Sequence, residues 1–72
     1  MSVKGQYPIP AKYGQRVRFH RHPGPARLVS ELKGEGVFEL AWLGIEECWE
    51  IRLGNGEQVS LYPCFGDTME PL

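Results

Sequence analysis

The residues best suited to chemistry lie in a basic stretch near the start of the chain. Between residues 16 and 20, arginine and histidine alternate with apolar side chains, and Arg21 and His22 follow. On a strand this alternation places Arg16, Arg18 and His20 on one outward face, where cationic groups neutralise phosphates and nearby aromatic rings stack on bases. We therefore predict a polyanion-binding surface formed by Arg16, Arg18, His20, Arg21 and Arg27. The alternative is a solvated face that pairs with carboxylates of the same chain.

The distribution of charge favours such a surface more than the net charge does. The net charge is −1, which argues against a general nucleic-acid binder. Residues 1–36 carry seven basic and two acidic side chains, a charge of +5, whereas residues 37–72 carry one basic and seven acidic side chains, a charge of −6. This split predicts a basic end that meets nucleic acid or an acidic protein surface, or two ends that meet in a homo-oligomer. If the halves interleave in the fold, they neutralise each other instead.

The other reactive side chains do not form a recognisable site. The potential zinc ligands lack the spacing of a finger or ribbon, and they are His20, His22, Cys48 and Cys64. We therefore predict no metal site and two free thiols. The acidic group of Glu46, Glu47 and Glu50 lacks the cleft that acid–base catalysis needs. We predict no catalytic residue and no cofactor.

The strongest structural signal is a hairpin in the second half of the chain. Segments 48–53 and 57–62 flank a Gly-Asn-Gly turn. A three-residue loop with Gly56 in the left-handed position pairs Ile51 with Val59 and sorts apolar residues onto one face. The opposite face is a mixed polar surface beside Cys48. We predict that it contacts a partner or a second copy through Glu50, Arg52, Gln58, Ser60 and Tyr62.

Short segments between glycines and prolines predict the remaining elements. Residues 15–20 form the first strand, with its apolar residues inward. Residues 26–33 fit either a strand or a short helix, and the strand is favoured. Residues 37–43 form a central strand that is apolar on both faces, although the apolar residues of segment 38–49 also follow a helical stripe. Pro63 ends the last ladder, and a short turn after it closes the fold.

This pattern resembles the small Src-homology-3 (SH3)-like and Tudor-like barrels. The stretch from Trp49 to Pro63 is similar to the penultimate hairpin of many such domains. The resemblance implies an all-β fold, a small five-stranded SH3-like barrel over residues 12–72. We expect an extended N-terminal arm over residues 1–11 and a short closing turn at the other end.

Two short motifs also resemble the plasmid-encoded type II dihydrofolate reductases. Tyr13-Gly14, followed by Arg16-Val17-Arg18, resembles their first strand, and Val59-Ser60-Leu61-Tyr62-Pro63 resembles their Val-Gln-Ile-Tyr-Pro active-site strand. The resemblance implies a tetramer with one shared pore in which hydride passes from a nicotinamide cofactor. The chain departs from the family at Ser60, where the family has the Gln that contacts both ligands, and at Phe19, which stands at its pore Lys.

Length and composition limit the possible functions. A chain of 72 residues forms one domain with a small core, and it lacks the apolar run of a membrane-spanning helix. Residues 1–30 lack an apolar signal core, so we expect a cytoplasmic location and no membrane partner. We expect a non-catalytic interaction module whose basic first strand and loop bind a polyanion. The alternatives are the pore-type reductase and a small inhibitor or accessory protein that acts through protein contacts.

Overall fold

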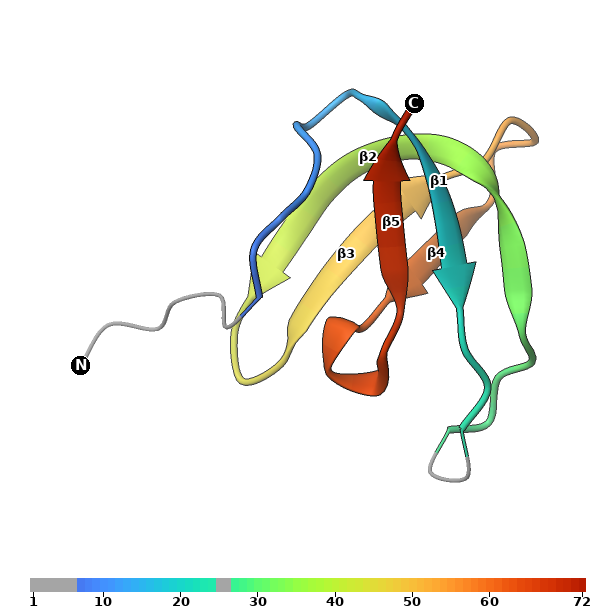
Figure 1. Ribbon diagram of the computed structural model, residues 1–72. Coiled ribbons are helices and arrows are strands. Elements are labelled where there is room, and N and C mark those ends of the chain that lie inside the picture. Colours follow the sequence, from blue (N-terminus) through green and yellow to red (C-terminus); the bar gives the residue numbers. More distant parts are fainter. Residues whose placement is uncertain (1–6, 25–26) are drawn as a thin grey trace.

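The computed structural model describes residues 7–24 and 27–72 and shows an all-β protein. The elements are β1 (Arg16–Arg21), β2 (Leu32–Leu43), β3 (Glu47–Arg52), β4 (Gln58–Leu61), the 3-10 helix η1 (Pro63–Phe65) and β5 (Thr68–Pro71). The 5 strands form one antiparallel sheet in the order β4-β3-β2-β1-β5, which confirms the predicted all-β class (Figure 1). Among the described residues, no helix has the length and apolar character needed to cross a membrane.

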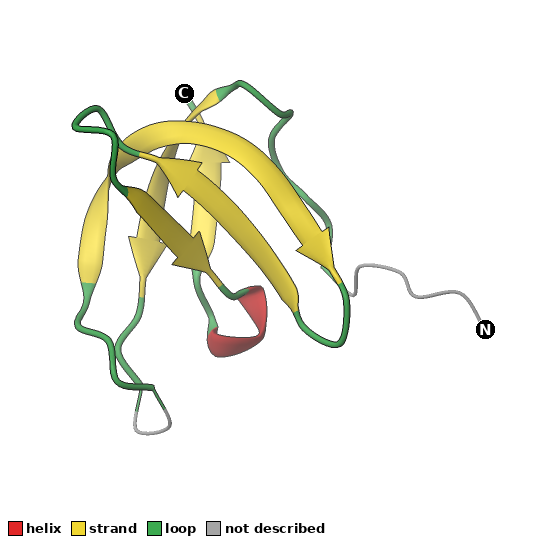
Figure 2. Ribbon diagram, turned by 180° about the vertical axis from the view of Figure 1, so that it is seen from behind, coloured by secondary structure: helices red, strands yellow, loops and turns green. Residues whose placement is uncertain are grey.

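One apolar core lies inside the curve of the sheet, and every strand contributes to it. Val17 and Phe19 of β1 point inward, as their alternation predicts. The 3-10 helix η1 packs against β3 at one end of the sheet, where it follows β4 (Figure 2). The buried core residues are Val17, Phe19, Phe38, Trp49, Ile51, Val59, Leu61 and Met69.

Strand β2 connects the two halves of the sheet by bending across it. Residues 32–37 pair with β1 and residues 37–43 pair with β3. The bend brings Gly36 so close to β3 that an added Cβ would lie 2.6 Å from the carbonyl oxygen of Arg52. A β-bulge between Phe38 and Leu40 then shifts the register. The helical alternative for segment 38–49 is therefore wrong, because this segment is the end of β2, a turn and the start of β3.

The β3–β4 hairpin has the register that the sequence predicts. Ile51 lies opposite Val59, and Trp49 lies opposite Leu61. The N–H of Leu53 donates to the carbonyl of Glu57 at 2.8 Å, which closes the loop. Its last residue, glycine 56, has a φ of 89°, as the left-handed turn position requires.

One predicted strand needs correction, and one strand of the sheet was not predicted. Strand β2 starts only at Leu32, so the strand predicted over residues 26–33 is wrong for residues 27–31, and residue 26 lies outside the described residues. Arg27 turns instead toward Asp67, which holds it in the loop. The fifth strand is β5, which follows the predicted closing turn and carries Met69 into the core.

The arm reaches the sheet through one buried carboxylate. Residues 7–11 have no regular secondary structure, and residues 1–6 of the predicted arm lie outside the described residues. The N–H of Tyr7 donates to Glu47 Oε1 at 3.1 Å. Glu47 Oε2 accepts a second bond, of 2.7 Å, from Trp49 Nε1. Glu47 thus ties the arm to the core, so it is a structural residue here rather than part of an acidic surface group.

Candidate functional site

The solvent-facing side of β2, β3 and β4 carries the side chains predicted to contact a partner or a second copy. Because Trp49 and Ile51 point into the core, the residues between and beside them point outward. The same alternation on β4 turns Ser60 outward opposite Glu50. We call this surface the outer sheet face, and its residues are Leu40, Trp42, Cys48, Glu50, Arg52, Gln58, Ser60 and Tyr62. It contains all of the predicted interface residues.

Sequence reasoning missed Leu40 and Trp42, which it placed in a strand buried on both faces. Leu40 lies opposite Glu50 and Trp42 lies opposite Cys48, so both belong to the outer sheet face. Trp42 is 59% exposed. The cause is the bulge after Phe38, which resets the alternation and leaves only Ala41 of this segment packed against the core.

The polar groups of the outer sheet face form two separate clusters. At one end, Glu39 accepts from Gln58 at 2.7 Å and pairs with Arg52 at 3.0 Å. Near the centre, Glu50 accepts from Ser60 Oγ at 3.0 Å and from Cys48 Sγ at 3.7 Å. The first cluster balances its own charge, whereas the second carries an acid with no cation within salt-bridge distance among residues 7–24 and 27–72.

The Cys48 thiol on this face is poorly suited to nucleophilic chemistry. Burial raises its pKa above the ordinary value, and the nearby carboxylate of Glu50 raises it further, although a hydrogen bond with Tyr62 opposes this. Hydrogen bonding with Cys48 also raises the pKa of the Tyr62 hydroxyl. Because the thiolate is the reactive form, Cys48 stays protonated and inert at neutral pH.

We expect the two cysteines to react at very different rates. Cys48 is buried and Cys64 is exposed, so a thiol reagent such as Ellman's reagent should label Cys64 at least about tenfold faster. The measurement is the time course of thiol release in the native chain. The variant Cys64→Ser should lose the fast phase and keep the slow one. Equal rates for both thiols in the native chain would contradict this account of Cys48.

The predicted polyanion surface is exposed, but its arginines do not stand alone in solvent. Arg16 and Arg18 both pair with Glu35 of β2, at 3.3 and 3.1 Å. Arg18 also lies 3.8 Å from Glu70 of β5. The alternative of pairing with carboxylates of the same chain therefore applies, because the antiparallel neighbours of β1 place Glu35 and Glu70 directly across from Arg18, and Glu35 is also within reach of Arg16. Glu35 belongs to the basic half of the sequence, so of these contacts only that between Arg18 and Glu70 joins the two halves.

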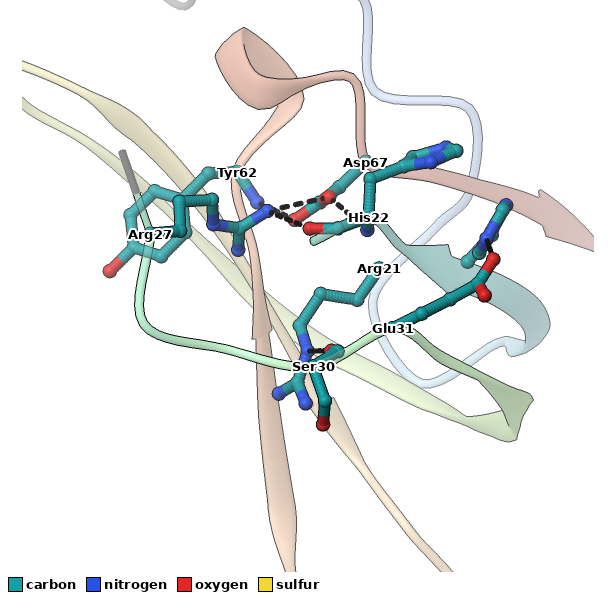
Figure 3. Close-up of polar contacts among 8 residues, drawn as sticks. Arg21, His22, Arg27, Ser30, Glu31, Tyr62 and Asp67 are labelled. Atoms are coloured by element: carbon teal, nitrogen blue, oxygen red, sulfur yellow. Dashed lines mark hydrogen bonds and ion pairs between the residues drawn. The ribbon is translucent and has the colours of Figure 1, made fainter. Parts of the chain in front are cut away.

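Local polar contacts join β1 to the residues that lead into β2. His20 Nε2 lies 2.6 Å from Glu31 Oε2, and hydrogen bonding to His20 lowers the pKa of Glu31 below its ordinary value. The guanidinium of Arg21 donates from Nε to the carbonyl of Ser30 at 3.2 Å (Figure 3). Of the predicted polyanion residues, His20 and Arg21 thus make these contacts.

Arg27 belongs to a buried ion pair rather than to a binding surface. Its side chain is 7% exposed, that of Asp67 is 0% exposed, and Nη1 lies 2.9 Å from Oδ1 (Figure 3). Asp67 also accepts from the backbone N–H of His22 at 2.8 Å and of Tyr62 at 2.9 Å. The Arg27 guanidinium lies 4.6 Å from the ring centroid of Phe65. The assignment of Arg27 to polyanion binding is therefore wrong.

Asp67 is the residue that joins these segments, and sequence reasoning missed it. Burial alone would raise its pKa, but the bonds from Arg27 and from two backbone N–H groups hold the pKa below its ordinary value. Asp67 therefore stays ionised and fixes the end of β1, the residue after β4 and the start of β5 at one point. A lone acid after a glycine in a turn carries no periodic signal that reveals such a role.

The predicted zinc-type ligands do not come together. His20 and His22 stack with ring centroids 3.8 Å apart, but Cys48 lies on the outer sheet face. Within the part of the chain that the structure describes, no group of three or more His, Cys, Asp or Glu side chains has the arrangement of a metal site.

Comparison with known proteins gives no relative for this chain. No family model, no curated protein and no solved structure matches it.

Proposed function

We propose that this chain is a non-catalytic interaction module that binds a protein partner through the outer sheet face. The observation that carries the proposal is the exposure of Trp42 at one end of a continuous face built by three strands. Tryptophan and tyrosine dominate the binding energy of protein interfaces, because they bury large areas at small entropic cost. Trp42 and Tyr62 supply such anchors on either side of Cys48.

The small size of the chain strengthens this proposal. A domain of 72 residues has a small core, so most of its large apolar side chains are needed inside. Yet Leu40 and Trp42 remain outside on one face, which lowers solubility unless a partner covers them. The five-stranded antiparallel sheet is also compatible with the resemblance to SH3-like barrels, which are interaction modules rather than enzymes in many proteins.

Polyanion binding by the basic first strand is the second candidate. Arg16 and Arg18 are exposed, and surface ion pairs contribute only about 0–1 kcal/mol, so a phosphate backbone can displace them. Glu35 and Glu70 would then stand beside the phosphates and repel them. Single-stranded DNA binding at low salt that weakens in the double variant Arg16→Ala/Arg18→Ala would favour this candidate.

The pore-type reductase requires four chains around one pore. In a single chain, Leu61 is fully buried, and Ser60 and Tyr62 lie on the outer sheet face. The clefts lined by described residues, with volumes of about 290, 360 and 410 Å³, are too small to hold a dinucleotide together with a second substrate. A molar mass by light scattering below that of a tetramer would exclude this alternative.

Trp42→Ala should remove most of the affinity for the partner. We expect a loss of about 10- to 100-fold, because a tryptophan buried in an interface contributes about 2 kcal/mol or more. Proteins captured from source cells would be identified and purified, and the dissociation constant of the purified pair would then be measured calorimetrically.

Leu28→Ala is the matched control for this measurement. Leu28 is a fully exposed apolar residue in the loop after β1, outside the outer sheet face, so its removal should leave the affinity unchanged. Equal affinities of the Trp42→Ala variant and the wild type would refute the proposal.

A further inference from the structure

We infer that the partner surface bound by the outer sheet face is basic and presents lysine or arginine beside apolar side chains. This inference rests on the proposed function and adds the chemistry of the partner. Two observations support it: acidic side chains lie at the aromatic end of the face, and the arginine of the face pairs with a different acid.

Two carboxylates border the exposed aromatic residues of the face. Glu50 lies opposite Leu40 on β2, and Glu46 lies in the exposed turn between Leu43 and β3. Both carboxylates lie close enough to the Tyr62 hydroxyl to interact with it electrostatically. Neither has a basic side chain within 4.0 Å among the residues that the structure describes. Arg52, the arginine of this face, lies at the opposite end of the face and pairs there with Glu39. The aromatic end of the outer sheet face therefore combines exposed aromatic side chains with unpaired carboxylates.

The unpaired carboxylates and the exposed aromatic rings both favour a cation on the partner. A guanidinium or ammonium group gains from a neighbouring carboxylate and from the face of an exposed indole ring. The chain uses the same chemistry internally, where Arg27 binds Asp67 and lies over Phe65. Glu46, Glu50 and Trp42 repeat this combination of carboxylate and aromatic ring on the surface, with the cation left for the partner to supply.

The same charges argue against the other occupants of this face. In a twofold dimer, each copy would bring Glu46 and Glu50 against a face that carries the same acids, which costs binding energy. A nucleic acid would bring phosphates against them. A basic protein surface is the occupant whose charge complements the face.

The test uses the full chain and two synthetic peptides as probes. One peptide alternates lysine and arginine with leucine, and the other has glutamate and aspartate in place of the basic residues. Each is titrated into the isotope-labelled chain, and backbone and indole N–H shifts are followed by NMR. We expect the basic peptide to shift Trp42 and the amides of β3 and β4, and the acidic peptide to shift none of them.

Charge variants separate a local role of the two acids from the effect of net charge. Glu46→Gln/Glu50→Gln should weaken binding of the basic peptide about 3- to 10-fold, because each rim pair contributes little on its own. Glutamine at position 50 keeps an oxygen that accepts from Ser60. The control Glu57→Gln/Glu70→Gln removes the same charge from other exposed positions and should change the affinity less than about twofold.

The outcomes distinguish this inference from the proposed function. If the basic peptide fails to bind, or if both charge variants weaken its binding equally, the inference is wrong. If both peptides bind equally well and both lose affinity in Trp42→Ala, the face binds proteins but does not select basic ones. If Trp42→Ala leaves every peptide and the purified partner unaffected, the proposed function fails as well.

Discussion

Replacing Asp67 with alanine should destabilise the protein by about 3–5 kcal/mol, because removal of one partner from a buried ion pair leaves the other charge without compensation. Arg27 would remain almost fully buried, and two backbone N–H groups, of His22 and Tyr62, would lose their acceptor. Small domains have free energies of unfolding of about 5–15 kcal/mol, so this single change would remove a large part of the total. The measurement is chemical denaturation followed by tryptophan fluorescence.

Two comparisons make the Asp67 result specific. Glu70→Ala removes an exposed acid three residues further on, whose contact with Arg18 is 3.8 Å long, and should cost less than about 0.5 kcal/mol. If Asp67→Ala unfolds the chain completely, Asp67→Asn gives a measurable intermediate, because its amide oxygen still accepts one bond. A loss for Asp67→Ala no larger than that for Glu70→Ala would contradict the structural role of Asp67.

The contribution of Asp67 should also depend on pH in a defined direction. Its pKa in the folded chain lies below the ordinary value of 3.8. The folded state therefore favours the charged form, and this stabilisation is complete well above pH 3.8. It declines as the pH falls below that value and is lost once the pH is below the folded-state pKa. The difference in free energy of unfolding between wild type and Asp67→Asn should shrink over the same range.

Gly36→Ala should cost about 1–3 kcal/mol, because the added methyl group has no space. Its Cβ would lie 2.6 Å from the carbonyl oxygen of Arg52 and 2.7 Å from Cγ2 of Ile51. Relief requires β2 to move away from β3 at the point where it passes from one half of the sheet to the other. The measurement is the midpoint and slope of urea denaturation, which separate lost stability from a change in the unfolded state.

Gly44→Ala is the matched control for this substitution. An added Cβ at Gly44 meets no atom within 4 Å, and the residue lies in the turn before β3. Its effect should be neutral or slightly stabilising, because alanine restricts the unfolded chain more than glycine does. Equal effects of the two substitutions would show that close packing at Gly36 is not what shapes β2.

Local patterns predicted those parts of the fold that local forces determine. The β3–β4 register follows from alternation with a period of two and from the left-handed position of Gly56, both of which are visible within the hairpin. The same alternation predicted the inward residues of β1. The bend of β2 was not predictable in this way, because it depends on contact between Gly36 and a neighbouring strand.

The site was predicted less well because its determinants are distant in sequence. Arg27 reads as a surface cation until Asp67, separated from it by 40 positions, is placed beside it. Arg18 reads as unpaired until the sheet brings Glu35 across from it. Trp42 reads as a core residue because no pattern in the sequence reveals the bulge that turns it outward.

The most direct test of the central claim is an NMR map of the labelled chain in complex with its purified protein partner. Binding through the outer sheet face predicts shift changes at the Trp42 indole and along the second half of β2, β3 and β4, with β1 and β5 unchanged. Changes centred on Arg16, Arg18 and the strands that pair with them, with Trp42 undisturbed, would contradict the claim and locate binding on the opposite part of the sheet.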